Sequence, residues 1–372
     1  MDPRITRLAD LLVGYSCAIQ RGEKVLVESI GFDALPLVHE VIRYVTLAGG
    51  IVYTNIRHDR LTRQFLHAAD EEQIRAQARY DLHRMKEMQC YIGVRGTPNT
   101  SEMVDVPTEK LRWWNKYYND PVHMKTRVPK TRWVVLRWPN DSMAQNARRP
   151  LYPFEDFYFD VCTLDYGRMS KAMDPLKAMM EATDRVQLTA PGTDLSFSIK
   201  GLPAIKCDGH VNIPDGELYT APVKDSINGT ILFNTASLFE GTVFENITLV
   251  FKNGKVVEAD AGPNTEKLNN ILNRDKGARY VGEFALGFNP HIQTAMLDTL
   301  FDEKIAGSIH MALGNSYDDC DNSNKSSIHW DIVLIQRPEC GGGEIRFDGK
   351  VIRQDGIFTA RELKGLNPDK LK

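Results

Sequence analysis

The chain has 372 residues, which is long for one ordinary domain and comfortable for two. Apolar residues make up 42% and charged residues 26%, as in soluble globular proteins. The 46 basic and 49 acidic residues give a net charge of −3, and this balance argues against a general binder of nucleic acid or of membrane surfaces. The six cysteines are scattered and form no C-x-x-C pair, which predicts reduced thiols. The sequence shows no apolar run of membrane-spanning length and no signal-like N-terminus, so we expect a cytoplasmic protein.

The first half of the sequence alternates between helical and strand-like patterns. We expect helices near residues 3–20, 33–48, 60–67, 71–87 and 108–119, and strands at 24–29, 51–56, 89–94 and 132–138. The strands are nearly continuous apolar runs, which is typical of a parallel sheet covered on both faces. No G-x-G-x-x-G follows a strand, so dinucleotide binding is not indicated.

The second half changes character. Residues 141–184 are mainly helical, and from about residue 186 short strands and turns dominate. Two hairpins are expected, one over 246–260 on an Asn253-Gly254 turn and one over 344–356 on an Asp348-Gly349 turn. We therefore predict an α/β protein, with an N-terminal α/β domain (1–185) that has a parallel sheet and a C-terminal α+β domain (186–372) that is rich in short strands.

Ionisable side chains interrupt three strand-like runs of the second half. His329 and Asp331 share one face of a strand, ~6–7 Å apart, while His310 and Glu283 lie in two other apolar runs. Imidazole and carboxylate groups on stiff backbone are good metal ligands. Each group taken alone would more often be part of a solvated face, so the pattern predicts a metal site in the C-terminal domain only when the strands are taken together.

Six ordered motifs give the sequence a family resemblance: PGTDL (191–195), NIPDGELYTAP (212–222), GEFALGFN (282–289), LFDEKIAGSIHMALGNSY (300–317), SIHWDIV (327–333) and RFDGKVIRQDGIF (346–358). With these motifs the chain resembles the thermophilic-type metallo-aminopeptidase family, which includes aminopeptidases T and S, over essentially its whole length.

The resemblance implies a set of site residues. The implied metal ligands are Glu217, Glu283, Glu303, His310, Tyr317, His329 and Asp331. They would hold two divalent ions, and mixed N/O ligation without thiolate suits zinc, cobalt or manganese. Glu217 is the expected general base, and Tyr317 would stabilise the oxyanion.

The leading functional hypothesis is a metal-dependent aminopeptidase that acts on short peptides, and the resemblance also implies a homodimer. A second hypothesis is an Fe(II)-dependent ring-cleaving dioxygenase of the dihydroxypyridine type, because His310, His329 and Asp331 alone would form a 2-His-1-carboxylate site. We prefer the peptidase because Glu217 and Glu283 would complete a second metal position. A third hypothesis is a non-catalytic relative that kept the fold.

Overall fold

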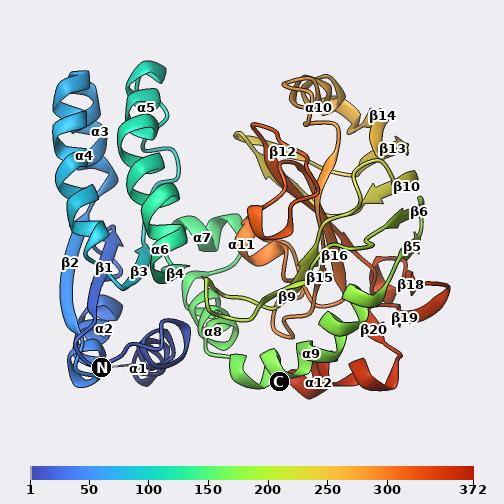
Figure 1. Cartoon of the computed structure of the whole chain (residues 1–372), viewed down its shortest axis with the longest axis horizontal. Helices are drawn as coiled ribbons and strands as arrows, with labels where there is room; N and C mark the ends of the chain where they lie inside the picture. Colours follow the sequence, from blue (N-terminus) through green and yellow to red (C-terminus); the bar gives the residue numbers. More distant parts are fainter. Residues whose placement is uncertain (1) are drawn as a thin grey trace. The chain divides into compact units, whose positions relative to one another are not determined.

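The computed structural model describes residues 2–372, which divide into two compact units (Figure 1). The first unit contains the chain up to Thr163 together with Gly209–Pro214, and the second contains Leu164–Asp208 and Asp215–Lys372. By this division the helix over Tyr166–Ala182 belongs to the second unit, whereas the sequence analysis places it before the domain boundary at residue 185. No helix among residues 2–372 is long and apolar enough to cross a bilayer.

The first unit is an α/β unit with one sheet. Its elements are α1 (Pro3–Asp10), η1 (Leu11–Ser16), β1 (Lys24–Ile30), α2 (Leu35–Leu47), β2 (Ile51–Arg57), α3 (Asp59–Ala68), α4 (Glu71–Lys86), β3 (Cys90–Arg95), α5 (Thr108–Trp114), η2 (Asn115–Arg127), α6 (Val128–Lys130), β4 (Arg132–Arg137), α7 (Asp141–Asn146), α8 (Leu151–Cys162) and β8 (Asn212–Ile213). The strand order is β2-β1-β3-β4-β8 and every pair is parallel, which confirms the predicted parallel sheet.

Packing on this sheet follows the predicted apolar runs. Leu26 of β1 and Tyr91 of β3 lie in a buried cluster with Ala78 and Met85 of α4 and with Tyr118 of η2. Two helices differ from their expected form, because α1 and α5 each continue as a π-helix, η1 and η2. The helix expected near 108–119 therefore extends, in π form, to residue 127.

The second unit is built mainly of short antiparallel strands, as expected. Its elements are α9 (Tyr166–Ala182), β5 (Arg185–Ala190), β6 (Thr193–Ser198), β7 (Ile205–Cys207), β9 (Glu217–Thr220), β10 (Asn228–Phe233), β11 (Ser237–Phe239), β12 (Thr242–Phe244), β13 (Ile247–Lys252), β14 (Lys255–Asp260), η3 (Gly262–Asn264), α10 (Thr265–Leu272), β15 (Val281–Gly287), α11 (Thr299–Asp302), β16 (Ser308–Gly314), η4 (Asp318–Cys320), β17 (His329–Ile335), η5 (Pro338–Cys340), β18 (Glu344–Phe347), β19 (Lys350–Gln354), β20 (Ile357–Phe358), η6 (Arg361–Leu366) and α12 (Pro368–Leu371).

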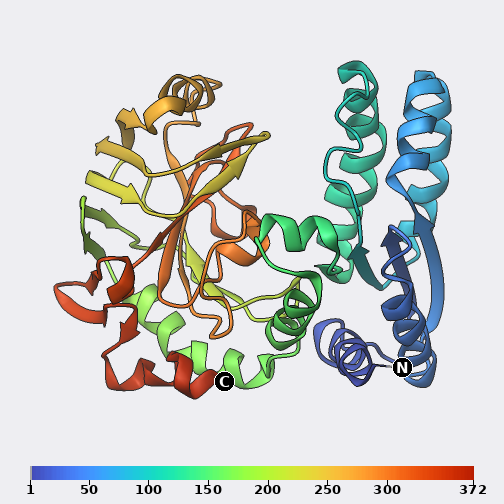
Figure 2. The same cartoon turned by 180° about the vertical axis from the view of Figure 1, so that it is seen from behind.

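These strands form a large sheet, a smaller sheet and a short ribbon. The large sheet has the order β14-β13-β10-β6-β5-β18-β19-β20, the smaller one has the order β17-β16-β15-β9-β7, and β11 pairs with β12. Both expected hairpins are confirmed, since β13 pairs with β14 and β18 with β19. Their turn residues, Asn253-Gly254 and Asp348-Gly349, all have the positive φ values that such tight turns require. The view from behind shows α9 and α12 side by side at one end of this unit (Figure 2).

Candidate metal centre

One face of the smaller sheet carries four of the predicted ligands. Glu283 on β15 lies opposite Ala312 on β16, and Ala312 lies opposite Asp331 on β17. Because side chains alternate along a strand, His310 and His329 point to the same face as these two carboxylates. Ala312, which has a small side chain, lies between the two carboxylates in the register of the three strands.

Glu217 reaches the same face from β9. It lies opposite Gly287 of β15, and an added Cβ at Gly287 would lie 2.7 Å from the Ile305 carbonyl oxygen and 2.8 Å from that of Glu303. Only a glycine therefore lets the segment after α11 pack directly on the sheet. This close approach brings Glu303 and its neighbour Lys304 to the cluster.

Backbone carbonyls orient both imidazole rings. His329 Nδ1 lies 2.8 Å from the Asn315 carbonyl oxygen, and His310 Nδ1 lies 3.2 Å from that of Glu303. A carbonyl only accepts, so each Nδ1 carries a hydrogen and each Nε2 is left to face the cluster. Metal-ligating histidines are oriented in this way in proteins.

The ligand atoms converge, and only some of them form hydrogen bonds with one another. His310 Nε2 lies 3.1 Å from Glu283 Oε1, and His329 Nε2 lies 3.2 Å from Glu283 Oε2 and 3.4 Å from Asp331 Oδ1. Three buried atoms nevertheless have no hydrogen-bond partner: Glu217 Oε2, His329 Nε2 and Asp331 Oδ1. Buried polar atoms are rarely left in this state, so the donor set fits divalent cations bound among these atoms.

The ligand atoms fall into overlapping groups. Glu217, Glu283 and His310 form one group within 4.8 Å, and Glu283, His329 and Asp331 form another. Glu283 belongs to both groups, with one oxygen facing each imidazole. Each group alone could hold a metal ion, and the two groups share the carboxylate of Glu283.

Electrostatics in the metal-free protein follow from this crowding. Burial disfavours a charged imidazole, but Glu217 and Glu283 outweigh it and raise the pKa of His310 to about 10. Burial is likewise outweighed at His329, where Asp331 and Glu283 raise the pKa to about 12. Without metal, protons on the two imidazoles therefore supply the positive charge that the carboxylates require.

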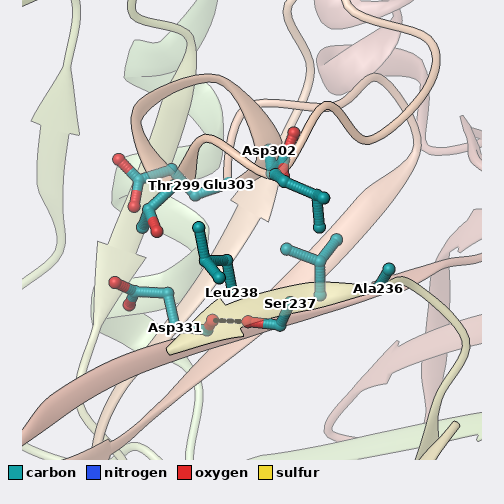
Figure 3. Close-up of a pocket in the computed structure, with 9 residues that line it drawn as sticks. Ala236, Ser237, Leu238, Thr299, Asp302, Glu303 and Asp331 are labelled. Atoms are coloured by element: carbon teal, nitrogen blue, oxygen red, sulfur yellow. Dashed lines mark hydrogen bonds between the residues drawn. The ribbon is translucent and has the colours of Figure 1, made fainter. Parts of the chain in front are cut away.

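The remaining predicted residues lie at the margin of the cluster. Glu303 forms a third possible ligand group with His310 and Asp331. Figure 3 shows the carboxylates of Glu303 and Asp331 on the same side of a small pocket, with that of Asp302 turned away. Asp302 instead accepts backbone hydrogen bonds at the start of α11, including one of 2.7 Å from Met296.

Tyr317 reaches the cluster through its ring. Its ring centroid lies 4.5 Å from that of His329, and the residue is 45% exposed. Tyr317 therefore lies at the solvent-exposed edge of the cluster.

Sequence reasoning missed three residues near the cluster. Lys304 is completely buried against Glu217 and Glu303. Cys207 and Asp215 each offer a possible ligand atom within 4.8 Å of one on Glu217. A lysine next to Glu303 in a segment flanked by apolar residues was the available signal for Lys304. No pattern linked Cys207 or Asp215 to the strands that carry the other ligands.

Comparison with known proteins gives the family. The model of the thermophilic metalloprotease (M29) family matches residues 1–352. The chain belongs to this family. Membership confirms the expected class of enzyme, a metal-dependent peptidase, and implies the use of divalent metal.

Two relatives match this chain over different lengths. The chain is 26% identical to aminopeptidase 2 of Geobacillus stearothermophilus, across 95% of both proteins. It is 37% identical to aminopeptidase T of Thermus thermophilus over 202 residues, 47% of each chain.

Solved structures show the same fold. Wild-type AmpT from Thermus thermophilus superposes with a TM-score of 0.79 at 20% identity, covering 96% of this chain and 99% of that one. The 2,5-dihydroxypyridine dioxygenase from Pseudomonas putida KT2440 superposes with a TM-score of 0.64 at 13% identity, covering 98% and 99%. The fold class predicted from the sequence is confirmed.

Proposed function

We propose that this chain is a metal-dependent aminopeptidase that removes N-terminal residues from short peptides. The carrying observation is the set of three buried ligand atoms, on Glu217, His329 and Asp331, that have no hydrogen-bond partner. Family membership and the aminopeptidase names of the relatives support the same reaction.

The proposed centre takes two divalent ions, zinc, cobalt or manganese, in the two overlapping ligand groups. Nitrogen and oxygen ligands without thiolate suit these metals. When bound, such ions lower the pKa of a coordinated water and polarise a carbonyl oxygen, which is the chemistry that peptide hydrolysis needs.

The chain's own residues divide the remaining work. Glu217 is the proposed general base, because its carboxylate is buried in the cluster and burial raises its pKa. The Tyr317 side chain, at the exposed edge beside His329, is placed to donate its hydroxyl hydrogen to a developing oxyanion. Burial of Glu283 and His310 keeps bulk water from the ligand side of the site.

The test is a matched pair of substrates. Protein purified without chelator should contain divalent metal and should hydrolyse aminoacyl chromogenic substrates, with loss of activity in chelator and recovery with zinc, cobalt or manganese. The same substrates carrying an acetylated amine should react at least about a hundredfold more slowly, because a free amine defines an aminopeptidase. Equal rates on both would contradict exopeptidase action.

The dioxygenase hypothesis is tested on the same preparation. Its support is the triad of His310, His329 and Asp331, whose nitrogen and oxygen ligands would suit iron(II). Oxygen uptake with a dihydroxypyridine in the presence of iron(II), together with no peptide hydrolysis, would favour it over the aminopeptidase.

We also propose a cytoplasmic homodimer in which the second domain makes most of the contact. All six cysteines are free thiols, which suits a reducing compartment. Sheet edges in the second unit, at β14 and β20, are the kind of surface that a partner subunit covers. Light scattering should give about twice the 42.1 kDa chain mass. A fully active monomer would contradict the proposal.

A further inference from the structure

Lys304 is a buried cation inside the candidate metal centre. The residue has no exposed surface, and its Nζ lies 3.2 Å from Glu217 Oε1 and in closer contact with Glu303 Oε1. Burying an ammonium group is costly unless it is paired, and here both partners are residues of the proposed ligand set. The lysine thus takes up two carboxylate oxygens that a metal would otherwise use.

The backbone fixes this lysine in place. Its N–H donates to the Phe301 carbonyl oxygen at 3.0 Å, and its own carbonyl accepts from the Asn289 N–H at 3.0 Å. The next residue, Ile305, forms a parallel bridge with Asn289, and the same segment packs against Gly287. These backbone contacts hold Lys304 against the sheet, and its side chain is completely buried.

The two ligand groups differ in their contact with this cation. In the group of Glu283, His329 and Asp331, no member forms an ion pair with Lys304 in the part of the chain that the structure describes, and the lysine charge lowers the pKa of Asp331 less than His329 and His310 do. In the group of Glu217, Glu283 and His310, Glu217 shares one oxygen with the lysine, and its other oxygen lies 3.6 Å from His310 Nδ1. The group of Glu217, Glu283 and His310 therefore already contacts one positive charge, the Lys304 ammonium beside Glu217.

We propose that Lys304 makes the two metal positions unequal: an ion at Glu283, His329 and Asp331 binds first and tightly, whereas an ion at the Glu217 position binds second and more weakly. This inference rests on the proposed function, since it concerns the same metal centre. The cause is repulsion between the ammonium group and a second divalent ion, strengthened by burial. Lys304 acts as a built-in competitor for the second ion.

Counting zinc ions on the metal-free full-length protein tests this. Native mass spectrometry gives the number of ions per chain, and calorimetry in zinc buffers gives the stepwise affinities. For the wild-type chain we expect one tight ion and a second at least about tenfold weaker, because one buried charge a few ångströms away has an effect of this order or larger. In Lys304→Met the second ion should bind at least about tenfold more tightly than in the wild type, with the first affected far less.

A matched control separates this local effect from a general change of charge. Lys325 belongs to the same unit, is 54% exposed and pairs with Asp318 and Asp321 on the surface. Lys325→Met removes the same charge and should leave both zinc affinities unchanged. Circular dichroism and thermal melting of each variant establish that it is folded before zinc is added.

Several results would overturn the inference. Two equally tight ions on the wild-type chain would do so even if Lys304→Met failed to fold, because that measurement needs no variant. One ion on both the wild type and Lys304→Met would also contradict it, as would the same gain in Lys325→Met. Two equal ions would leave the proposed peptidase standing, whereas no zinc binding at any concentration would remove both proposals.

Discussion

Both units of the molecule carry carboxylates on the strands of a sheet, and the surroundings of these carboxylates differ between the units. In the first unit, Glu28 of β1 accepts a 2.6 Å hydrogen bond from Asn55 and a 2.8 Å hydrogen bond from the Tyr91 hydroxyl, and Arg57 lies 3.5 Å away. Both oxygens of Glu28 are therefore paired. In the second unit, one oxygen of Glu217 and one of Asp331 have no hydrogen-bond partner.

The difference indicates which buried charges are structural. Burial raises the pKa of Glu28, but the Arg57 guanidinium and other cations outweigh it and lower the pKa, so this carboxylate is stabilised by the protein itself. The carboxylates of the second unit face two imidazoles that are themselves oriented by backbone carbonyls. A complete network needs no ligand, whereas an incomplete one of this composition is suited to bind a cation.

The largest expected effect is on catalysis. Glu283→Ala and His329→Ala should each lower the hydrolysis of aminoacyl substrates by about a thousandfold or more, because each removes a proposed metal ligand. Both proteins should remain folded, with metal content reduced. Glu258→Ala, an exposed carboxylate on β14, is the control and should retain full activity. Full activity in Glu283→Ala would mean that the carboxylates of the second unit do not hold a catalytic metal.

In the first unit, we expect loss of a buried carboxylate to lower stability and to leave zinc binding unchanged. Glu28→Ala should lower the free energy of unfolding by about 3 kcal/mol, because it breaks a buried, hydrogen-bonded ion pair and leaves Arg57 with one partner fewer. Zinc binding by the second unit should be unchanged. Urea unfolding is the measurement, with Glu87→Ala, whose pair with Lys24 is at the surface, as a control that changes stability little. An unaltered midpoint in Glu28→Ala would show that its network is not structural.

Much of this architecture could be predicted from local sequence. The strands of the first unit are apolar runs, and the hairpins of the second have Asn-Gly and Asp-Gly turns, so short-range signals were enough. The two-residue strand β8 could not be predicted. It lies more than 70 residues after β4 in the chain, and only its long-range pairing with β4 makes it a strand. The π-helical form of η1 and η2 has no comparable signature.

For the candidate site, residue types were predictable and their contacts were not. The H-x-D spacing places His329 and Asp331 on one face, and His310 and Glu283 interrupt two other apolar runs. Only the family resemblance supplied Glu217, Glu303 and Tyr317. The pairing of Lys304 with Glu217 depends on how the segment after α11 packs on Gly287, which is a long-range contact. The roles of all these ligands remain predictions.

A smaller effect is expected on thermal stability. Zinc at about 100 times its dissociation constant should stabilise the protein by about 2.7 kcal/mol, a rise of a few degrees in melting temperature for a protein of this size. Glu283→Ala should lose this rise and Glu28→Ala should keep it. Thermal denaturation in zinc buffers measures both. An equal rise in Glu283→Ala would show that zinc acts elsewhere.

The smallest effect is on protons, and it concerns the histidines of the two units. In the first unit, burial lowers the pKa of His123 to about 4, so this ring is neutral at pH 8. In the metal-free second unit, the pKa values of His310 and His329 are raised to about 10 and about 12, so both rings are charged. Their contribution to the stability of the metal-free protein is complete below the unfolded value of about 6.5, and it is lost as the pH rises through about 10 for His310 and through about 12 for His329.

Zinc needs the Nε2 lone pair of each ring, so it must displace these protons. Binding to the metal-free protein at pH 8 should therefore release up to about one proton per imidazole, and the apparent zinc affinity should increase with pH. Calorimetry in two buffers of different ionisation enthalpy gives the number released. His329→Gln should release fewer protons, and His123→Gln should release as many as the wild type. Zinc binding without proton release would mean that the imidazoles of His310 and His329 are not ligands, and the comparison between the two units would then rest on their carboxylates alone.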